Sequence, residues 1–114
     1  MQSENVGGAA NVVVKTVDAK LVHENGRGFA EEIEGLLEEG KTQVVLDFSR
    51  LAYISSWGIG TLAAIHSKFK KKGGKVKLAA LQSPIKIMLS IVGFDQLFEV
   101  FDSVPEAVAS FEVN

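Results

Sequence analysis

The segment from Ile54 to Leu62 reads ISSWGIGTL and holds two adjacent serines, the only tryptophan and two glycines ahead of an apolar pattern with helical spacing. A serine hydroxyl at the start of a helix can accept a hydrogen bond from an N–H group of the first turn. A phosphate there would meet free N–H groups and the positive end of the helix dipole. Ser55 or Ser56 is therefore predicted at or beside an N-cap, either as a structural cap or as a phosphate carrier. Gly58 and Gly60 lack Cβ, so another backbone or an oxyanion could come close.

Two further patterns could indicate an enzyme, but each lacks an essential part. Asp47 ends an apolar run and His66 lies near a helical apolar stripe, so a Ser–His–Asp triad can be drawn on paper. The G-x-S-x-G nucleophile elbow is absent, and the two residues are interpreted as a loop anchor and a packed side chain. GIGTLA, residues 58–63, matches the dinucleotide pattern G-x-G-x-x-A, but the next strand pattern ends in QSP without a carboxylate. A small hydrolase or nucleotide-binding protein is therefore the third function that we consider.

A lysine cluster follows this helical pattern and contains half of the 12 Lys and Arg residues of the chain. Phe69 is the one aromatic residue among them, which argues against nucleic-acid binding. A solvated helix end favoured by the helix dipole and a docking face for an acidic partner are the two interpretations. The cluster consists of Lys68, Lys70, Lys71, Lys72, Lys75 and Lys77.

The composition predicts one globular domain, because 46% of the 114 residues are hydrophobic and 23% are charged. The chain has no cysteine and only two histidines, so we expect no metal and no cofactor. A net charge of −2 predicts no attraction to nucleic acid or an anionic membrane. No apolar run approaches the roughly 18 residues of a membrane helix, and residues 1–10 lack the features of a signal peptide. We therefore expect a flexible lead-in over residues 1–10, a domain over residues 11–114 and a cytoplasmic protein.

Strand and helix patterns alternate along the chain, with HENGRG, residues 23–28, expected to turn the chain. Ser83 is a candidate N-cap, Gly93 a helix stop, and Ser103 with Glu106 a capping box. Apolar and β-branched runs predict strands over residues 11–17, 19–22, 43–48, 75–81 and 97–101. Helical spacing predicts helices over residues 29–39, 59–69, 83–92 and 103–111.

This order predicts an α/β fold of one domain, with a mixed, mostly parallel sheet of about four to five strands covered by about four helices. The functional groups of such sheets gather at the carboxyl ends of the strands, where ISSWGIG is placed. The first two strand patterns are close in sequence and leave room for an antiparallel N-terminal edge.

The segment from Val44 to Phe111 resembles the STAS domain of bacterial anti-sigma factor antagonists. The resemblance rests on a combination of an apolar strand, the serine-glycine turn, a basic helix followed by GG, the segment VGFDQLFEVFDS and a final helix EAVASF. It extends more loosely back through AKLVHENGRGFAEEIEGLLEEG. The resemblance implies a STAS-like fold and a regulatory binding protein, not an enzyme.

Family members bind a cytoplasmic serine kinase that doubles as an anti-sigma factor, and phosphorylation of a serine at the start of the second helix breaks that capture. The family pattern D-S-S/T-G-L-G, aligned on Gly58-Ile59-Gly60, implies Ser56 as the acceptor, with Ser55 as second choice. It also implies partner-binding roles for Ser55, Trp57, Gly58 and Gly60. Trp57 is interpreted either as an exposed interface anchor or as a side chain packed on the sheet. The implied partner is a serine-kinase anti-sigma factor, and we expect a monomer or weak dimer.

Two departures from the family pattern motivate a second function. Ser55 stands at the position of the family's aspartate, and AKLV, residues 19–22, replaces the family's GELD turn. The alternative is a STAS scaffold or adaptor in a signalling complex that is never phosphorylated.

Overall fold

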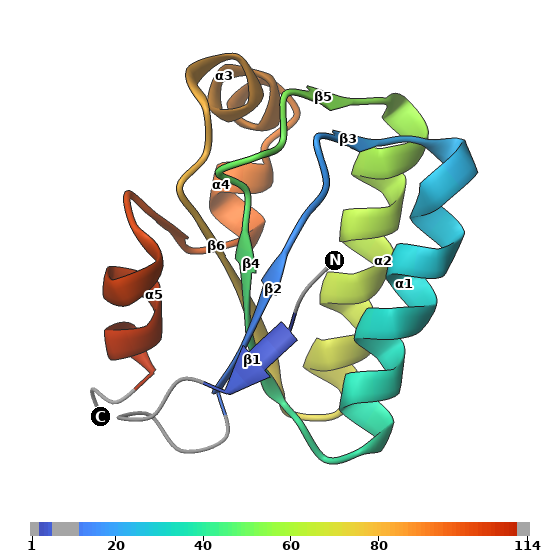
Figure 1. Ribbon diagram of the computed structural model, residues 1–114, viewed down its shortest axis with the longest axis vertical. Helices are drawn as coiled ribbons and strands as arrows, with labels where there is room; N and C mark the ends of the chain where they lie inside the picture. Colours follow the sequence, from blue (N-terminus) through green and yellow to red (C-terminus); the bar gives the residue numbers. More distant parts are fainter. Residues whose placement is uncertain (1–2, 6–11, 112–114) are drawn as a thin grey trace.

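The computed structural model describes residues 3–5 and 12–111, which fold into strands and helices arranged around one main sheet (Figure 1). The strands are β1 (Ser3–Asn5), β2 (Val12–Thr16), β3 (Lys20–Leu21), β4 (Gln43–Asp47), β5 (Tyr53–Ile54), β6 (Lys75–Ala79) and β7 (Val100–Phe101). The helices are α1 (His23–Glu38), α2 (Ser56–Lys71), α3 (Ser83–Ile91), α4 (Phe94–Leu97) and α5 (Val104–Ser110).

The main sheet has five described strands in the order β1-β2-β4-β6-β7. β2, β4, β6 and β7 run parallel to one another, and β1 pairs antiparallel with β2. β3 and β5 form a separate parallel pair. The prediction of a single α/β domain with a mixed, mostly parallel sheet is confirmed.

Helices cover both faces of the main sheet (Figure 1). α1, α2, α3 and α4 contribute to the larger apolar cluster on one face, and α5 contributes to the smaller cluster on the other. In β4, Val44 and Leu46 belong to the larger cluster, whereas Val45 belongs to the smaller one. A strand buried on both faces has a continuous apolar sequence, which explains the run at residues 43–48.

The small parallel pair brings the starts of two helices together. β3 leads into α1 and β5 leads into α2, and Leu21 of β3 lies in register with Ile54 of β5. α1 and α2 consequently begin side by side at the end of the molecule where the parallel strands have their carboxyl ends (Figure 1).

Residues 23–28 form the first turns of α1, so the prediction of a turn there is wrong. The side chain of Asn25 supports this start, because its Oδ1 accepts a hydrogen bond from Val22 N at 2.9 Å and its Nδ2 donates to Lys20 O at 2.7 Å. Gly26 N donates to Val22 O at 2.7 Å. A glycine inside a helix costs about 1 kcal/mol relative to alanine. Packing against α2 offsets that cost here. The local sequence pattern does not reveal this contact between helices.

The N-terminal part also differs from expectation. Ser3–Asn5 form β1, whereas the sequence indicated a flexible lead-in over residues 1–10. The remaining residues of the lead-in, together with residues 11 and 112–114 of the predicted domain, lie outside the described residues. The antiparallel edge is made by β1 and β2, while the second predicted strand pairs with β5 instead.

The C-terminal half follows the predicted order with local changes. Gly93 ends α3 with a positive φ of 81°, as expected, but Gln82 occupies the N-cap position predicted for Ser83. The strand expected over residues 97–101 is shortened to β7, because α4 precedes it and buries Phe94 against the core. The capping box of α5 is confirmed, since Ser103 Oγ accepts a hydrogen bond from Glu106 N at 3.3 Å.

Candidate functional site

Ser55 is the N-cap of α2. Its backbone is extended, with φ −87° and ψ 170°, and its Oγ accepts a hydrogen bond from Gly58 N at 3.1 Å. Ser55 N in turn donates to Leu21 O at 3.0 Å, which ties the cap to β3. The hydroxyl of Ser55 is thus half-buried and engaged in holding the start of the helix.

Ser56 is the first residue of α2 and is exposed. Its side chain has no hydrogen-bond partner within residues 3–5 and 12–111, and the same holds for the backbone N–H groups of Ser56 and Trp57. The first turn of a helix leaves such N–H groups without partners inside the helix, and they carry the positive end of its dipole. The hydroxyl of Ser56 is therefore exposed and has no partner among the described residues, and an oxyanion attached to it would lie close to these donors.

Trp57 packs against α1 and not on the sheet, while its interpretation as an interface anchor stays a prediction. Its ring meets the imidazole of His23 edge to face, with centroids 5.1 Å apart, and it covers Gly26. A Cβ atom on Gly26 would lie 1.9 Å from Cζ3 of the indole, so Gly26 provides the space for the ring. With 38% of its surface exposed, Trp57 is both fixed in position and accessible.

A shallow groove of about 280 Å³ continues from Trp57 between α1 and α2. Ala30, Thr61 and Ala64 provide small side chains along it, and Arg27, Glu31 and Glu34 provide charges of both signs. The exposed start of α2 and this groove form one surface of α1 and α2, which we call the α1/α2 face.

Gly58 and Gly60 have different tasks although they lie two positions apart in α2. A Cβ atom on Gly58 would lie 2.5 Å from Leu21 O and 2.8 Å from Ile54 Cγ1, so Gly58 allows the close approach of another backbone. A Cβ atom on Gly60 would meet nothing within 4 Å. The space beside Gly58 is filled by β3, which leaves no room there for the pyrophosphate that G-x-G-x-x-A predicts.

Asp47 and His66 do not form a triad with the serines. Asp47 Oδ1 accepts a hydrogen bond from Ser49 N at 3.0 Å, which confirms its interpretation as a loop anchor. His66 is half-buried, and its ring lies edge-on to Phe98 at 5.1 Å between centroids, which confirms it as a packed side chain.

The lysine cluster is divided by the fold. Lys68 pairs with Glu34 of α1 at 2.8 Å, and Lys70, Lys71 and Lys72 are exposed at the end of α2. Lys77 lies on the opposite face of the sheet under α5, where its Nζ donates to Ser110 Oγ at 2.7 Å. The six lysines therefore do not form one docking face.

Lys77 also lies 4.1 Å from the centroid of the Phe111 ring, and only 6% of its side chain is exposed. Burial lowers the pKa of Lys77, and the nearby carboxylate of Glu99 partly opposes this shift. The pKa of Glu99 is lowered, chiefly by its hydrogen bond with Lys75 at 2.8 Å. This network joins β6 to the β7 edge of the sheet and lies away from Ser56.

Within the described part of the chain, no group of three or more His, Asp or Glu side chains could hold a metal ion. None of its helices is long and apolar enough to cross a membrane.

Two contributors to the α1/α2 face were missed by the sequence analysis, His23 and Gly26. Both lie in the segment predicted as a turn, and no local signal indicates that a distant tryptophan will pack on them.

Comparison with known proteins identifies a STAS domain. The STAS domain model matches residues 4–107. A relative from Bordetella bronchiseptica, named "Putative anti-sigma factor antagonist BtrV", is 30% identical over 88 residues, which are 77% of this chain and 76% of the relative.

Solved structures show the same fold. The crystal structure of a "putative anti-sigma factor antagonist" from Thermotoga maritima matches with a TM-score of 0.88 at 22% identity, covering 98% of this chain and 94% of that one. The phosphorylated form of the Bacillus cell fate determinant SpoIIAA matches with a TM-score of 0.73 at 19% identity over 96% of each chain.

Proposed function

The chain belongs to the STAS-domain family of anti-sigma factor antagonists, and from this premise we propose that it binds a serine-kinase anti-sigma factor and is released from it when Ser56 is phosphorylated. In this role the protein is a regulatory binding partner, not an enzyme. The kinase step consumes ATP, so the proposed switch operates in the cytoplasm.

The observation that carries the proposal is the position of Ser56. Its hydroxyl is exposed at the first position of α2 and has no partner in the described structure, whereas Ser55 beside it is engaged as the cap. A kinase needs an accessible hydroxyl, so these contacts favour Ser56 over Ser55 as the acceptor.

The effect of a phosphate follows from charge. Phosphorylation adds about −1.5 to −2 charge at neutral pH. Within the domain, this charge would lie at the positive end of α2 near the N–H groups of Ser56 and Trp57, where it is tolerated. Beneath a bound partner it would have to be desolvated against apolar or acidic surface, which weakens the complex.

The partner is proposed to contact the α1/α2 face around Ser56. Trp57 offers a fixed and accessible aromatic ring, and aromatic residues often dominate binding energies. The exposed backbone at Gly60 allows close approach. Ser55 and Gly58 contribute indirectly, because they set the position of the helix start and do not contact the partner themselves.

Incubation with the cognate kinase, ATP and Mg²⁺, followed by intact-mass measurement, tests the switch. We expect a gain of one phosphate in the wild type and in Ser55→Ala, and no gain in Ser56→Ala. Phosphorylated protein is then expected to lose the kinase in a pull-down. A mass gain that persists in Ser56→Ala would overturn the assignment of Ser56, and no gain in the wild type would overturn phosphorylation as the switch.

The scaffold function remains the second candidate, because a neutral Ser55 and the segment AKLV occupy positions that are acidic in the family pattern. These two segments lie together in the structure, since β3 pairs with β5 immediately before Ser55. Equal capture of the same partner by Ser56→Ala and Ser56→Asp would favour the scaffold. Loss of capture in Ser56→Asp alone would favour the switch.

A further inference from the structure

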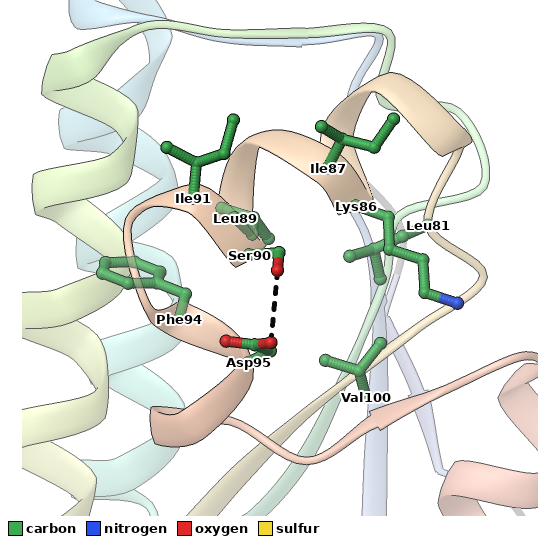
Figure 2. A pocket seen from close by; sticks show the side chains of 9 residues that line it. All are labelled: Leu81, Lys86, Ile87, Leu89, Ser90, Ile91, Phe94, Asp95 and Val100. Atoms are coloured by element: carbon green, nitrogen blue, oxygen red, sulfur yellow. Dashed lines mark hydrogen bonds between the residues drawn. The ribbon is translucent and has the colours of Figure 1, made fainter.

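A pocket of about 380 Å³ lies between α3, α4 and β7 (Figure 2). Its walls are apolar side chains from all three elements and from the connection between β6 and α3, namely Leu81, Ile87, Leu89, Ile91, Phe94 and Val100. A volume above about 300 Å³ with mostly apolar walls is typical of small-ligand sites. This pocket is separate from the α1/α2 face, because the two share no lining residue.

The base and the rim of the pocket differ in burial. Leu89 and Phe94 are buried in the core, whereas Ile87 and Ile91 are 62% and 80% exposed. The inner side of α3 is thus apolar. Part of its outer side is also apolar, because Ile87 and Ile91 lie one helical turn apart on the same stripe. Contiguous exposed apolar surface around a cavity commonly marks a binding site.

The polar groups of the pocket determine the kind of ligand. Lys86 lies on one rim, and its nearest carboxylate is Asp102 Oδ1 at 4.0 Å, with the two side chains 60% and 90% exposed. Such a loose, exposed ion pair has little stability, so the ammonium group is available to another anion. On the other rim, Ser90 Oγ donates to Asp95 Oδ2 at 3.3 Å, and these two groups engage each other (Figure 2).

We propose that this pocket binds a medium-chain fatty acid, with its aliphatic chain between α3 and β7 and its carboxylate at Lys86. The apolar walls suit a flexible hydrocarbon chain that carries no further polar groups. The one cation at the rim selects an anionic head group, and Asp95 at the opposite rim disfavours a second one. This inference does not depend on the phosphorylation of Ser56.

Titration of the full chain with decanoate below its micelle concentration tests the proposal, by calorimetry and by methyl NMR. We expect one saturable site, with shifts of the methyl signals of Ile87, Leu89, Ile91 and Val100 and unchanged signals beside Trp57. Octanoate is expected to bind roughly fifteenfold more weakly, because two methylene groups fewer are buried. No saturable binding, or shifts centred on the α1/α2 face, would overturn the proposal.

Head-group controls test the carboxylate. Decanol and decyltrimethylammonium are expected to bind at least several-fold more weakly than decanoate, and Lys86→Gln is expected to remove the preference for decanoate over decanol. Lys71→Gln is the matched control, since Lys71 is also exposed on a helix but lines neither pocket. Equal affinities of Lys86→Gln and Lys71→Gln for decanoate would contradict the role of Lys86. Co-sedimentation with phosphatidylglycerol vesicles that depends on Lys86 would contradict a free acid as the ligand.

Discussion

The neighbouring strands β4 and β6 are followed by α2, which β4 reaches through β5, and by α3, yet the starts of the two helices are built in different ways. α2 begins with a side-chain cap from Ser55, a glycine against Leu21 O and a tryptophan across α1. α3 begins at Gln82 without a side-chain cap and turns Ile87 and Ile91 outward. The first arrangement holds an exposed hydroxyl in a fixed position, and the second leaves apolar surface without a partner. Equivalent positions in the fold can therefore present different chemistry to a binding partner.

The two sides of α3 should respond most differently to mutation. Ile85 is 1% exposed, so Ile85→Ala is expected to lower the free energy of unfolding by about 2–5 kcal/mol. Ile91 is 80% exposed, and Ile91→Ala is expected to change it by less than about 0.5 kcal/mol. Urea unfolding of the two variants measures both values. Equal losses would show that the outer stripe of α3 is covered.

The two glycines of α2 should respond with opposite signs. Gly58→Ala places a methyl group 2.5 Å from Leu21 O and is expected to destabilise the protein by about 1–3 kcal/mol. Gly60→Ala meets no atom within 4 Å and is expected to stabilise it by up to about 1 kcal/mol, because alanine favours the helix. Thermal or urea unfolding tests the pair, and stabilisation by both substitutions would refute the close approach of β3.

The two serines should separate stability from function. Ser55→Ala removes the cap of α2 and is expected to cost about 1 kcal/mol. Ser56→Ala removes a hydroxyl without a described partner and is expected to change stability by less than about 0.5 kcal/mol. A larger loss in Ser56→Ala than in Ser55→Ala would reverse the roles assigned to the two residues.

Gly26→Ala is a test of the position of the Trp57 ring, and fluorescence rather than unfolding is its measurement. The new methyl group would displace the indole, so the fluorescence of the only tryptophan should shift towards that of an exposed ring. Gly28→Ala, in the same helix with no atom within 4 Å of its Cβ position, is expected to leave the emission unchanged. Identical spectra for the two variants would contradict the packing of Trp57 on α1.

Periodic patterns predicted most of the fold, because each of the long elements carries its own signal. The apolar run of β4 and the capping box of α5 are local features, and both are found where they were predicted. The start of α1 was missed because two glycines within six residues look like a turn until the ring of Trp57 covers one of them. α4 was missed because four residues are too few to show a helical period.

The sequence by itself determined the alternation of strands and helices and the presence of hydroxyls at the start of α2, since both depend on residues close together in the chain. Only the tertiary structure decided where α2 begins, and hence which serine is the cap and which is free, because Leu21 and β3, more than 30 positions away, hold the segment before the helix. The pocket beside α3 is likewise a product of the tertiary fold. Its walls come from several elements that only the folded sheet brings together, so no residue spacing in the sequence predicts the pocket.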